Sequence, residues 1–424
     1  MSKRQAGGLG TLLLMPSFQG GLAWAFWLAM YEARLLAWDP APPLANALYV
    51  LALAFYALST VTWYSKYRAW RDLNDAELLY DRKARRTAPE ARLYLGTLHA
   101  LGFLGWALYT RDFAAALGGL PTFAQLLLGA SWMIRRQAEV TSSVGTQLSY
   151  FGWIAIALTC YEYWRGRVSR LWLAVAALQF LANFLYIART GPTTILFTTG
   201  MLALIAVPVA KTKALALRVV GLAVVLGIIF LVIASWTGKV ALQGQYGATI
   251  LPLWAQNLYF YGTGSFGYFS HLVDVQEPIA YVPERALYPA LKALAAVGIV
   301  PSPPSQINEY FSMPFTTNVG TFLEPFYRDG GFTFAFAAIL VHSFGLDWLG
   351  LALLRSGRRL ALFAWANLCF VTFISFFTPK LTGFPTWLFT ALAIAAGLLK
   401  GNHRRSTLPA STVTARTGGQ DGAY

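Results

Sequence analysis

The sequence predicts an all-α polytopic membrane protein with about ten transmembrane helices (range 10 to 12) and one large extracytoplasmic loop. Two observations support this fold class. Apolar residues make up 57% of the chain and charged residues only 12%, whereas a soluble domain carries about 25% charge. The apolar residues also come in blocks of roughly 18 to 25, the length with which a helix crosses the hydrocarbon core. Because lipid offers no partners to backbone polar groups, such uninterrupted blocks indicate helices.

The spans and their orientation follow from the apolar blocks and from the basic residues between them. We expect spans at 11–31, 43–64, 93–109, 144–162, 171–187, 193–210, 219–236, 331–353, 360–378 and 384–399. With the N-terminus inside, 23 of the 33 Lys and Arg residues fall in cytoplasmic segments, as the positive-inside rule requires. Both termini are therefore predicted to be cytoplasmic. The net charge of +15 then reflects topology and contact with anionic membrane lipids, and no nucleic-acid partner is expected.

We interpret residues 1–400 as a single integral membrane domain and 401–424, rich in Ser, Thr, Gly and Arg, as a disordered cytoplasmic tail. The charged stretch 65–92 is expected to be a cytoplasmic loop, an amphipathic segment lying against the headgroups. The N-terminus does not resemble a cleavable signal, because Lys3 and Arg4 precede a first span with no clear cleavage site. Cys160 and Cys369 both lie in apolar segments and predict no disulfide framework.

The large loop, about 237–330, is too long to be a simple connector, so we expect function there. Within it, 283–297 is expected to form a short helix along the outer leaflet. The sequence GTGSFG at 262–267 follows no strand and is interpreted as a turn rather than a dinucleotide motif. A second outer stretch, 111–143, contains the segment 123–134, which is too short to span the membrane and suits an interfacial helix.

Several basic residues are predicted to lie outside, where membrane topology does not require them. A guanidinium group binds phosphate oxygens in a bidentate fork and keeps its charge at any working pH. A group of arginines facing the outer leaflet would therefore suit a lipid diphosphate headgroup. The candidates are Arg135, Arg136, Arg189, Arg285 and Arg328. The structural alternatives are that Arg189 snorkels at a helix end and that Arg328 pairs with Asp329.

Proton acceptors in the outer segments are few. They are His271, Asp274, Glu277, Glu284, Glu309, Glu324 and Asp329. The chain contains no metal-ligand motif of the HExxH type, no paired-carboxylate metal motif and no phosphate-binding glycine loop followed by Lys-Ser/Thr. We therefore expect neither a metal nor another cofactor.

Local patterns resemble the O-antigen polymerase family of the bacterial inner membrane, which joins oligosaccharide repeat units. Arg189 is followed eleven residues later by Gly200, which matches the family's R-x10-G pattern in outer loops. The segment NVGTFLEPFYRDGG, residues 318–331, resembles the family's entry into a helix after the large loop. The residues that match are Asn318, Thr321, Asp329 and Gly331, with Tyr261, Gly262 and Phe266 upstream. Arg285 departs from the pattern, because Ala296 stands eleven residues beyond it.

The resemblance implies a GT-C-like, metal-independent glycosyltransferase that acts on the periplasmic side. Its substrate would be an undecaprenyl-diphosphate-linked oligosaccharide, and a chain-length-regulating co-polymerase would be its partner. Arg189 and Arg285 would hold the diphosphate, with Arg135 or Arg136 assisting. Glu324, Asp329 and His271, in that order, are candidates for the general base. Candidate substrate-binding residues are Arg328, Asn318, Thr321 and the aromatic side chains of Tyr259, Tyr261, Tyr268, Tyr310 and Phe311.

Three other functions stay open at this point. An O-antigen ligase is closely similar, and its outer-loop histidine would be His271. A flippase for the same lipid-linked sugar would use ionisable residues inside the membrane, for which His342 and Asp347 of the eighth span are the main candidates. The large asymmetric loop favours a one-sided active site over transport. A lipid-sugar transferase with acidic residues in its first outer loop would have to rely on Glu32 and Asp39.

Overall fold

The computed structural model describes residues 3–81, 89–119, 144–186, 191–208, 252–275, 281–304, 311–312 and 316–399, and the single positions 211, 214, 217, 221 and 279. The N-terminal helices are α1 (Lys3–Leu12), α2 (Pro16–Glu32), α3 (Pro43–Asp81), α4 (Pro89–Leu117), α7 (Val144–Trp164), α8 (Arg170–Tyr186) and α9 (Gly191–Ala206). Then come α11 (Leu253–Asp274), α12 (Tyr288–Ala296), β1 (Phe311–Ser312), β2 (Thr316–Thr317), α13 (Leu323–Leu340), α14 (Leu346–Ser356), α15 (Arg359–Phe373) and α16 (Phe384–Leu399). Short helical turns lie at Val341–Gly345, Ile374–Phe376 and Lys380–Thr382. The interfacial helix expected at 123–134, most of the span expected at 219–236 and the tail 401–424 lie outside the described residues.

The described part of the chain is an all-α protein apart from the two-residue strands β1 and β2, which pair antiparallel. Three helical stretches are long and apolar enough to cross a membrane, namely Pro43–Leu78, Leu323–Ser356 and Arg359–Phe376. Three shorter apolar helices accompany them, at Arg170–Asn183, Thr193–Ala206 and Phe384–Ala396. This agrees with the predicted membrane class, while the number of spans stays a prediction.

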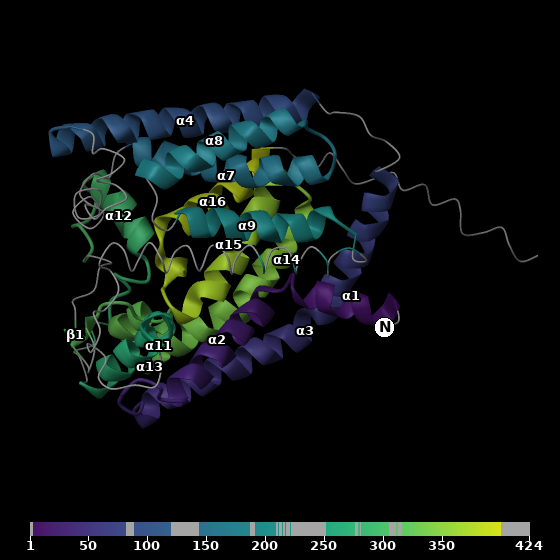
Figure 1. Ribbon diagram of the computed structural model, residues 1–424. Helices are drawn as coiled ribbons and strands as arrows, with labels where there is room; N and C mark the ends of the chain where they lie inside the picture. The colour runs from purple at the N-terminus through teal and green to yellow at the C-terminus, as the bar shows by residue number, and fades with distance from the viewer. Residues whose placement is uncertain are drawn as a thin grey trace, which may run out of the picture.

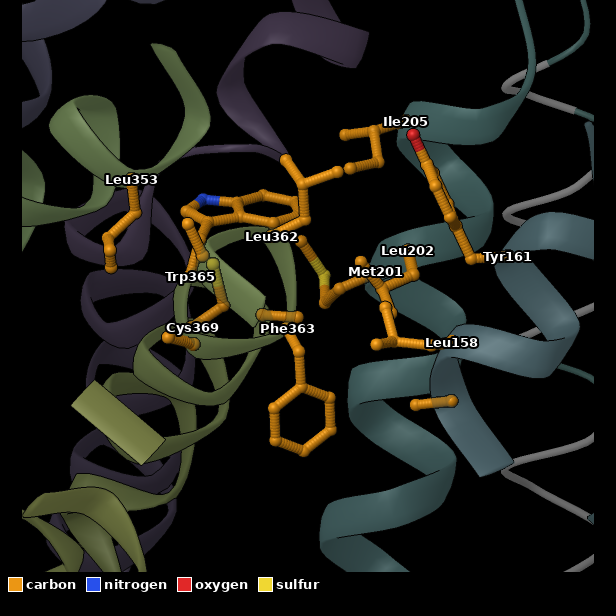
Figure 2. Packing of buried hydrophobic residues seen from close by; sticks show 14 of the residues in the cluster. Leu158, Tyr161, Met201, Leu202, Ile205, Leu353, Leu362, Phe363, Trp365 and Cys369 are labelled. Atoms are coloured by element: carbon orange, nitrogen blue, oxygen red, sulfur yellow. The ribbon is translucent and has the colours of Figure 1, made fainter. Parts of the chain in front are cut away.

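Figure 1 shows the helices in two groups with a third group between them. The helices α4, α7, α8 and α9 lie on one side, α2 and α3 lie on the other, and α14, α15 and α16 lie between these two sides. The central helix α15 contacts α2, α7, α9, α14 and α16. Figure 2 shows this core from close by: Phe363 and Trp365 of α15 lie between Leu353 of α14 and Met201 of α9.

Small residues let α4 and α7 approach each other closely. A Cβ atom added to Gly102 of α4 would lie 2.6 Å from the Cα atom of Gly152 on α7. One added to Gly145 of α7 would lie 2.4 Å from the backbone nitrogen of Tyr109. Without a hydrophobic effect between helices in lipid, this kind of backbone contact is a main source of helix association.

Helix α3 extends beyond the span expected at 43–64 and into the charged stretch 65–92. It continues without a break from Pro43 to Asp81, so residues 65–81 are helical, while the expected position of this stretch against the cytoplasmic headgroups stays a prediction. Arg71 within it is buried and donates to the carbonyls of Leu204 (2.8 Å) and Val207 (2.9 Å), at the C-terminal end of α9. A cation at that end satisfies unpaired carbonyls and opposes the negative end of the helix dipole.

The large loop also contains more helix than expected. The prediction of a turn at 262–267 is wrong, because α11 runs through this segment. The glycines serve packing: a Cβ atom on Gly262 would lie 1.9 Å from the Trp27 ring, and one on Gly267 would lie 2.6 Å from the Trp38 ring. The short helix expected at 283–297 is present as α12, but it begins only at Tyr288, with Pro289 in its first turn.

The long apolar stretch from Leu323 to Ser356 is not one regular helix. Gly330 and Gly331 leave helical geometry, and Gly331 has a φ of 60° that favours glycine. A π-helical turn, Val341–Gly345, follows α13 and leads directly into α14. The candidate site described below lies just before the two glycines, and the buried acid Asp347 lies just after the π-helical turn.

Candidate functional site

The loop end of the molecule is the end that holds α12, β1 and the first turns of α13, and it lies opposite the N-terminus (Figure 1). Five of the predicted site residues that the structure describes gather in this region: His271 on α11, Arg285 before α12, and Glu324, Arg328 and Asp329 on α13.

The start of α13 is fixed by its own sequence. The Thr321 hydroxyl accepts the backbone N–H of Leu323 (3.3 Å), and the Thr321 carbonyl accepts that of Glu324 (3.2 Å). Pro325 in the first turn has the backbone φ that a helix start needs. Since helical geometry is interrupted again at Gly330, residues 323–329 form a short separate helical piece. This piece places Glu324 and Arg328 one turn apart on the same face.

The charge pair on this piece is largely enclosed. The Arg328 Nε atom lies 2.7 Å from a Glu324 carboxylate oxygen, and the two side chains are 13% and 3% exposed. The Arg328 Nη2 atom donates to the hydroxyl of Tyr268 (3.0 Å). The sequence suggested Asp329 as the partner of Arg328, but the structure pairs Arg328 with Glu324 and Tyr268.

Aromatic rings extend the cluster. The fully buried Tyr268 ring packs against Phe311 of β1 with 5.4 Å between ring centroids, and His271 contacts the same Phe311 ring at 5.4 Å. Tyr268 and His271 lie three residues apart on α11 and so share one face. The half-buried His271 is therefore joined to Arg328 through two aromatic side chains.

Asp329 connects α13 to the chain segment before α12. Its carboxylate accepts the backbone N–H groups of Arg285 (3.0 Å) and Ala286 (2.8 Å). These bonds fix Arg285 beside the end of the helical piece that carries Arg328. The backbone of Arg285 thus lies against the residue that follows Arg328, although 43 positions separate the two arginines in the chain.

Gly320 is a site residue that the sequence analysis missed. A Cβ atom there would lie 2.7 Å from the Glu324 Cβ atom and 3.3 Å from the Tyr268 ring. A glycine at position 320 therefore leaves the space that the side chains of Glu324 and Tyr268 occupy. The signal was available in the motif NVGTF, where a glycine stands three residues before the first residue of the helix.

The other predicted residues lie apart from this cluster or cannot be described. Thr321 is buried and holds the helix start, and Asn318 is half-buried just after β2. Tyr261 lies two turns before Tyr268 on α11, with its ring 6.4 Å from that of Phe377. The remaining predicted residues, Arg135, Arg136, Arg189 and Tyr310, lie outside the described residues. Within the part that is described, no group of three or more His, Cys, Asp or Glu side chains could hold a metal ion.

The arrangement combines chemical groups that suit an anionic, sugar-bearing ligand. Arginine side chains recognise phosphate oxygens, a carboxylate can accept a proton, and aromatic faces suit sugar rings. No protein-family model matches the sequence, and no curated protein or solved structure is significantly similar to the chain. The function must therefore be argued from the site and from the resemblance in short motifs.

Proposed function

We propose that the protein is a metal-independent membrane glycosyltransferase that polymerises oligosaccharide repeat units carried on undecaprenyl diphosphate at the bacterial inner membrane. The observation that carries this proposal is the enclosed pair of Arg328 and Glu324 at the loop end, next to Asp329, which binds the backbone of Arg285. The resemblance of the segment NVGTFLEPFYRDGG to O-antigen polymerases also supports the proposal, and this segment contains Glu324, Arg328 and Asp329.

The proposed reaction follows from this chemistry. A hydroxyl of the acceptor sugar attacks the anomeric carbon of the donor, and the bond from that carbon to the diphosphate oxygen breaks. The lipid diphosphate leaves with the electron pair, and the guanidinium groups of Arg285 and Arg328 stabilise its developing charge. Glu324 takes the proton of the attacking hydroxyl. Asp329 has a different role, which is to position Arg285 through its backbone N–H groups.

One observation favours a second candidate, a ligase that transfers the finished glycan to the lipid A core. The resemblance to ligases requires a histidine in the outer loop, which would be His271. His271 contacts Phe311, and Phe311 also packs on Tyr268, the partner of Arg328. The two reactions share a donor and differ in the acceptor. The experiment must therefore separate polymerisation from transfer.

The test replaces Arg328 with Ala and, separately, with Lys in the native host, and displays the surface glycan on a gel. The matched control is Arg111→Ala, because Arg111 is also a predicted outer arginine but is 71% exposed and pairs with its neighbour Asp112. Membrane abundance of each variant is measured by immunoblot.

We expect the Arg328 variants to lose the polymer ladder and keep a single-repeat band, with the control unchanged. Loss of the single-repeat band as well would indicate a ligase or a flippase. A normal ladder from Arg328→Ala at normal abundance would contradict the proposal.

A further inference from the structure

Two ionisable side chains lie within the apolar stretch Leu323–Ser356, outside the cluster of Glu324, Arg328 and Asp329. His342 and Asp347 are both fully buried, and the glycosyltransferase mechanism uses neither of them. Ionisable residues at such positions are costly and usually have a function. The π-helical turn Val341–Gly345 contains His342 and ends two residues before Asp347.

The π-turn explains how both side chains reach the same neighbour. Residues five apart in an α-helix are rotated by about 140° and face different directions, whereas a π-turn has more residues per turn and reduces this difference. His342 Nδ1 lies 3.5 Å from the hydroxyl of Tyr56, and the Asp347 carboxylate accepts from Ser59 Oγ at 2.7 Å. Tyr56 and Ser59 are three residues apart on α3 and share one face.

Asp347 joins three helices through neutral donors. Its Oδ1 atom accepts the backbone N–H of Ser17 at 3.0 Å, and its Oδ2 atom contacts the Ser17 hydroxyl at 2.5 Å and the Ser59 hydroxyl at 2.7 Å. Among the described residues, no Lys, Arg or His nitrogen lies within 4.0 Å of its carboxylate. The titratable groups that interact electrostatically with it are Tyr56 and Tyr67 of α3 and Cys369 of α15, and His342 lies five residues before it in the chain.

The contacts around Asp347 can be compared with the number of hydrogens that the neighbouring hydroxyl groups can supply. Four oxygens form a chain of contacts: Asp347 Oδ2 to Ser17 Oγ (2.5 Å), Ser17 Oγ to Thr60 Oγ1 (3.0 Å), and Thr60 Oγ1 to the Tyr56 carbonyl (2.8 Å). If all three contacts are hydrogen bonds, they need three hydrogens. The hydroxyls of Ser17 and Thr60 supply one each, the carbonyl supplies none, and Ser59 uses its own hydrogen on Asp347. A proton on the Asp347 carboxyl group would supply the third.

We propose that Asp347 is an intramembrane proton-binding site: its carboxyl group carries a proton and donates it in a hydrogen bond to Ser17, which in turn donates to Thr60. This proton replaces the cation that a buried carboxylate would otherwise need. His342, whose Nε2 atom has no hydrogen-bond partner among the described residues, is the second ionisable group on the same face.

Loss of the proton has a structural consequence. Ser17 would then give its hydrogen to the Asp347 carboxylate, and Ser17 and Thr60 would face each other as two oxygens with no hydrogen between them, unless Thr60 gave up its bond to the Tyr56 carbonyl. Since Ser17 lies in the first turn of α2 and Thr60 lies in α3, one hydrogen bond between these helices depends on the proton.

The test is infrared spectroscopy of the full-length protein in lipid nanodiscs at neutral pH. A protonated carboxylic acid gives a C=O stretching band that a carboxylate lacks, and this band shifts in heavy water. We expect the wild type to show it and Asp347→Asn to lose the intensity of one carboxyl group. The amide nitrogen of asparagine can donate to Ser17 as the acid does, and the amide oxygen can accept the Ser17 backbone N–H, so this variant loses only the bond from Ser59 and should fold.

The matched control is Glu162→Gln. Glu162 is also fully buried, but it pairs with Arg359 at 2.6 Å and with Arg167 at 3.5 Å, so two cations balance its charge and its replacement should leave the band unchanged.

A second measurement needs no variant: labelling aspartate carboxyl groups with carbon-13 should shift the wild-type band. The proposal is overturned if the wild type lacks the band, if Asp347→Asn keeps its full intensity, or if the label does not move it. A sodium-dependent thermal stabilisation without the acid band would identify a sodium site instead.

Discussion

Arg328 and Glu324 form a nearly enclosed ion pair, 2.7 Å between nitrogen and oxygen, one helical turn apart at the start of α13. The pair matters because it fixes the orientation of a guanidinium group at the end of the bundle where the large loop meets the helices. Tyr268 from α11 adds a second bond to the same group. Pre-organised cations of this kind stabilise developing negative charge without having to reorient during the reaction.

Tyr268→Phe removes the hydroxyl that accepts from Arg328 and keeps the buried ring. A hydrogen bond to a charged group contributes about 1.5–3 kcal/mol, so we expect glycan polymerisation to fall roughly tenfold or more. The measurement is the intensity of the polymer ladder relative to the single-repeat band. Tyr49→Phe is the control, since Tyr49 is an equally buried tyrosine that bonds the Phe266 carbonyl (2.8 Å) outside the site. Equal ladders from the two variants would contradict a role for Tyr268 in orienting Arg328.

Asp329→Ala should release the segment before α12, because it deletes the acceptor of the Arg285 and Ala286 backbone N–H groups. We expect faster hydrogen exchange in a peptide that covers residues 283–296 and a destabilisation of about 1–3 kcal/mol. Asp329→Asn keeps one acceptor oxygen and should have a smaller effect. If Asp329→Asn instead abolished activity with unchanged exchange, Asp329 would be the general base and the positioning role would be wrong.

Gly320→Ala places a methyl group 2.7 Å from the Glu324 Cβ atom. Because both atoms are close to the backbone, the start of α13 must shift, and such overpacking costs about 1–3 kcal/mol. We expect a lower thermal midpoint in detergent and a weakened polymer ladder. Gly345→Ala serves for comparison, since the nearest atom to its added Cβ is a Val341 methyl carbon at 3.6 Å, an ordinary contact. A Gly320→Ala protein with normal stability and a normal ladder would contradict the proposed packing.

The sequence predicts the fold class and many helices well, because the length of an apolar segment decides whether it can cross the hydrocarbon core as a helix. It did not show that Arg71 is buried, because Arg71 finds its partners in the carbonyls at the end of α9, a tertiary contact with no local signature. It failed at 262–267, since the glycines admit tryptophans from distant parts of the chain.

The sequence named His271, Arg285, Glu324, Arg328 and Asp329 as candidates, but neither Gly320 nor the pairings within the cluster. The four-residue spacing of Glu324 and Arg328 could have predicted their ion pair once a helix was expected to begin near residue 323. The role of Asp329 could not be anticipated, because its partners are backbone N–H groups more than 40 positions away. Long-range hydrogen bonds to the backbone leave no pattern in side-chain identities.

The central claim is that the arginines of the loop end bind a lipid diphosphate. The most direct measurement is the thermal midpoint of the purified full-length protein in nanodiscs with and without added undecaprenyl diphosphate, since a ligand that binds only the folded state raises the midpoint. We predict a rise for the wild type and for Arg111→Ala, unaffected by a chelator, and a loss of most of the rise in Arg328→Ala and Arg285→Ala. An equal rise in the wild type and in both of these variants, each folded without ligand, would contradict the account.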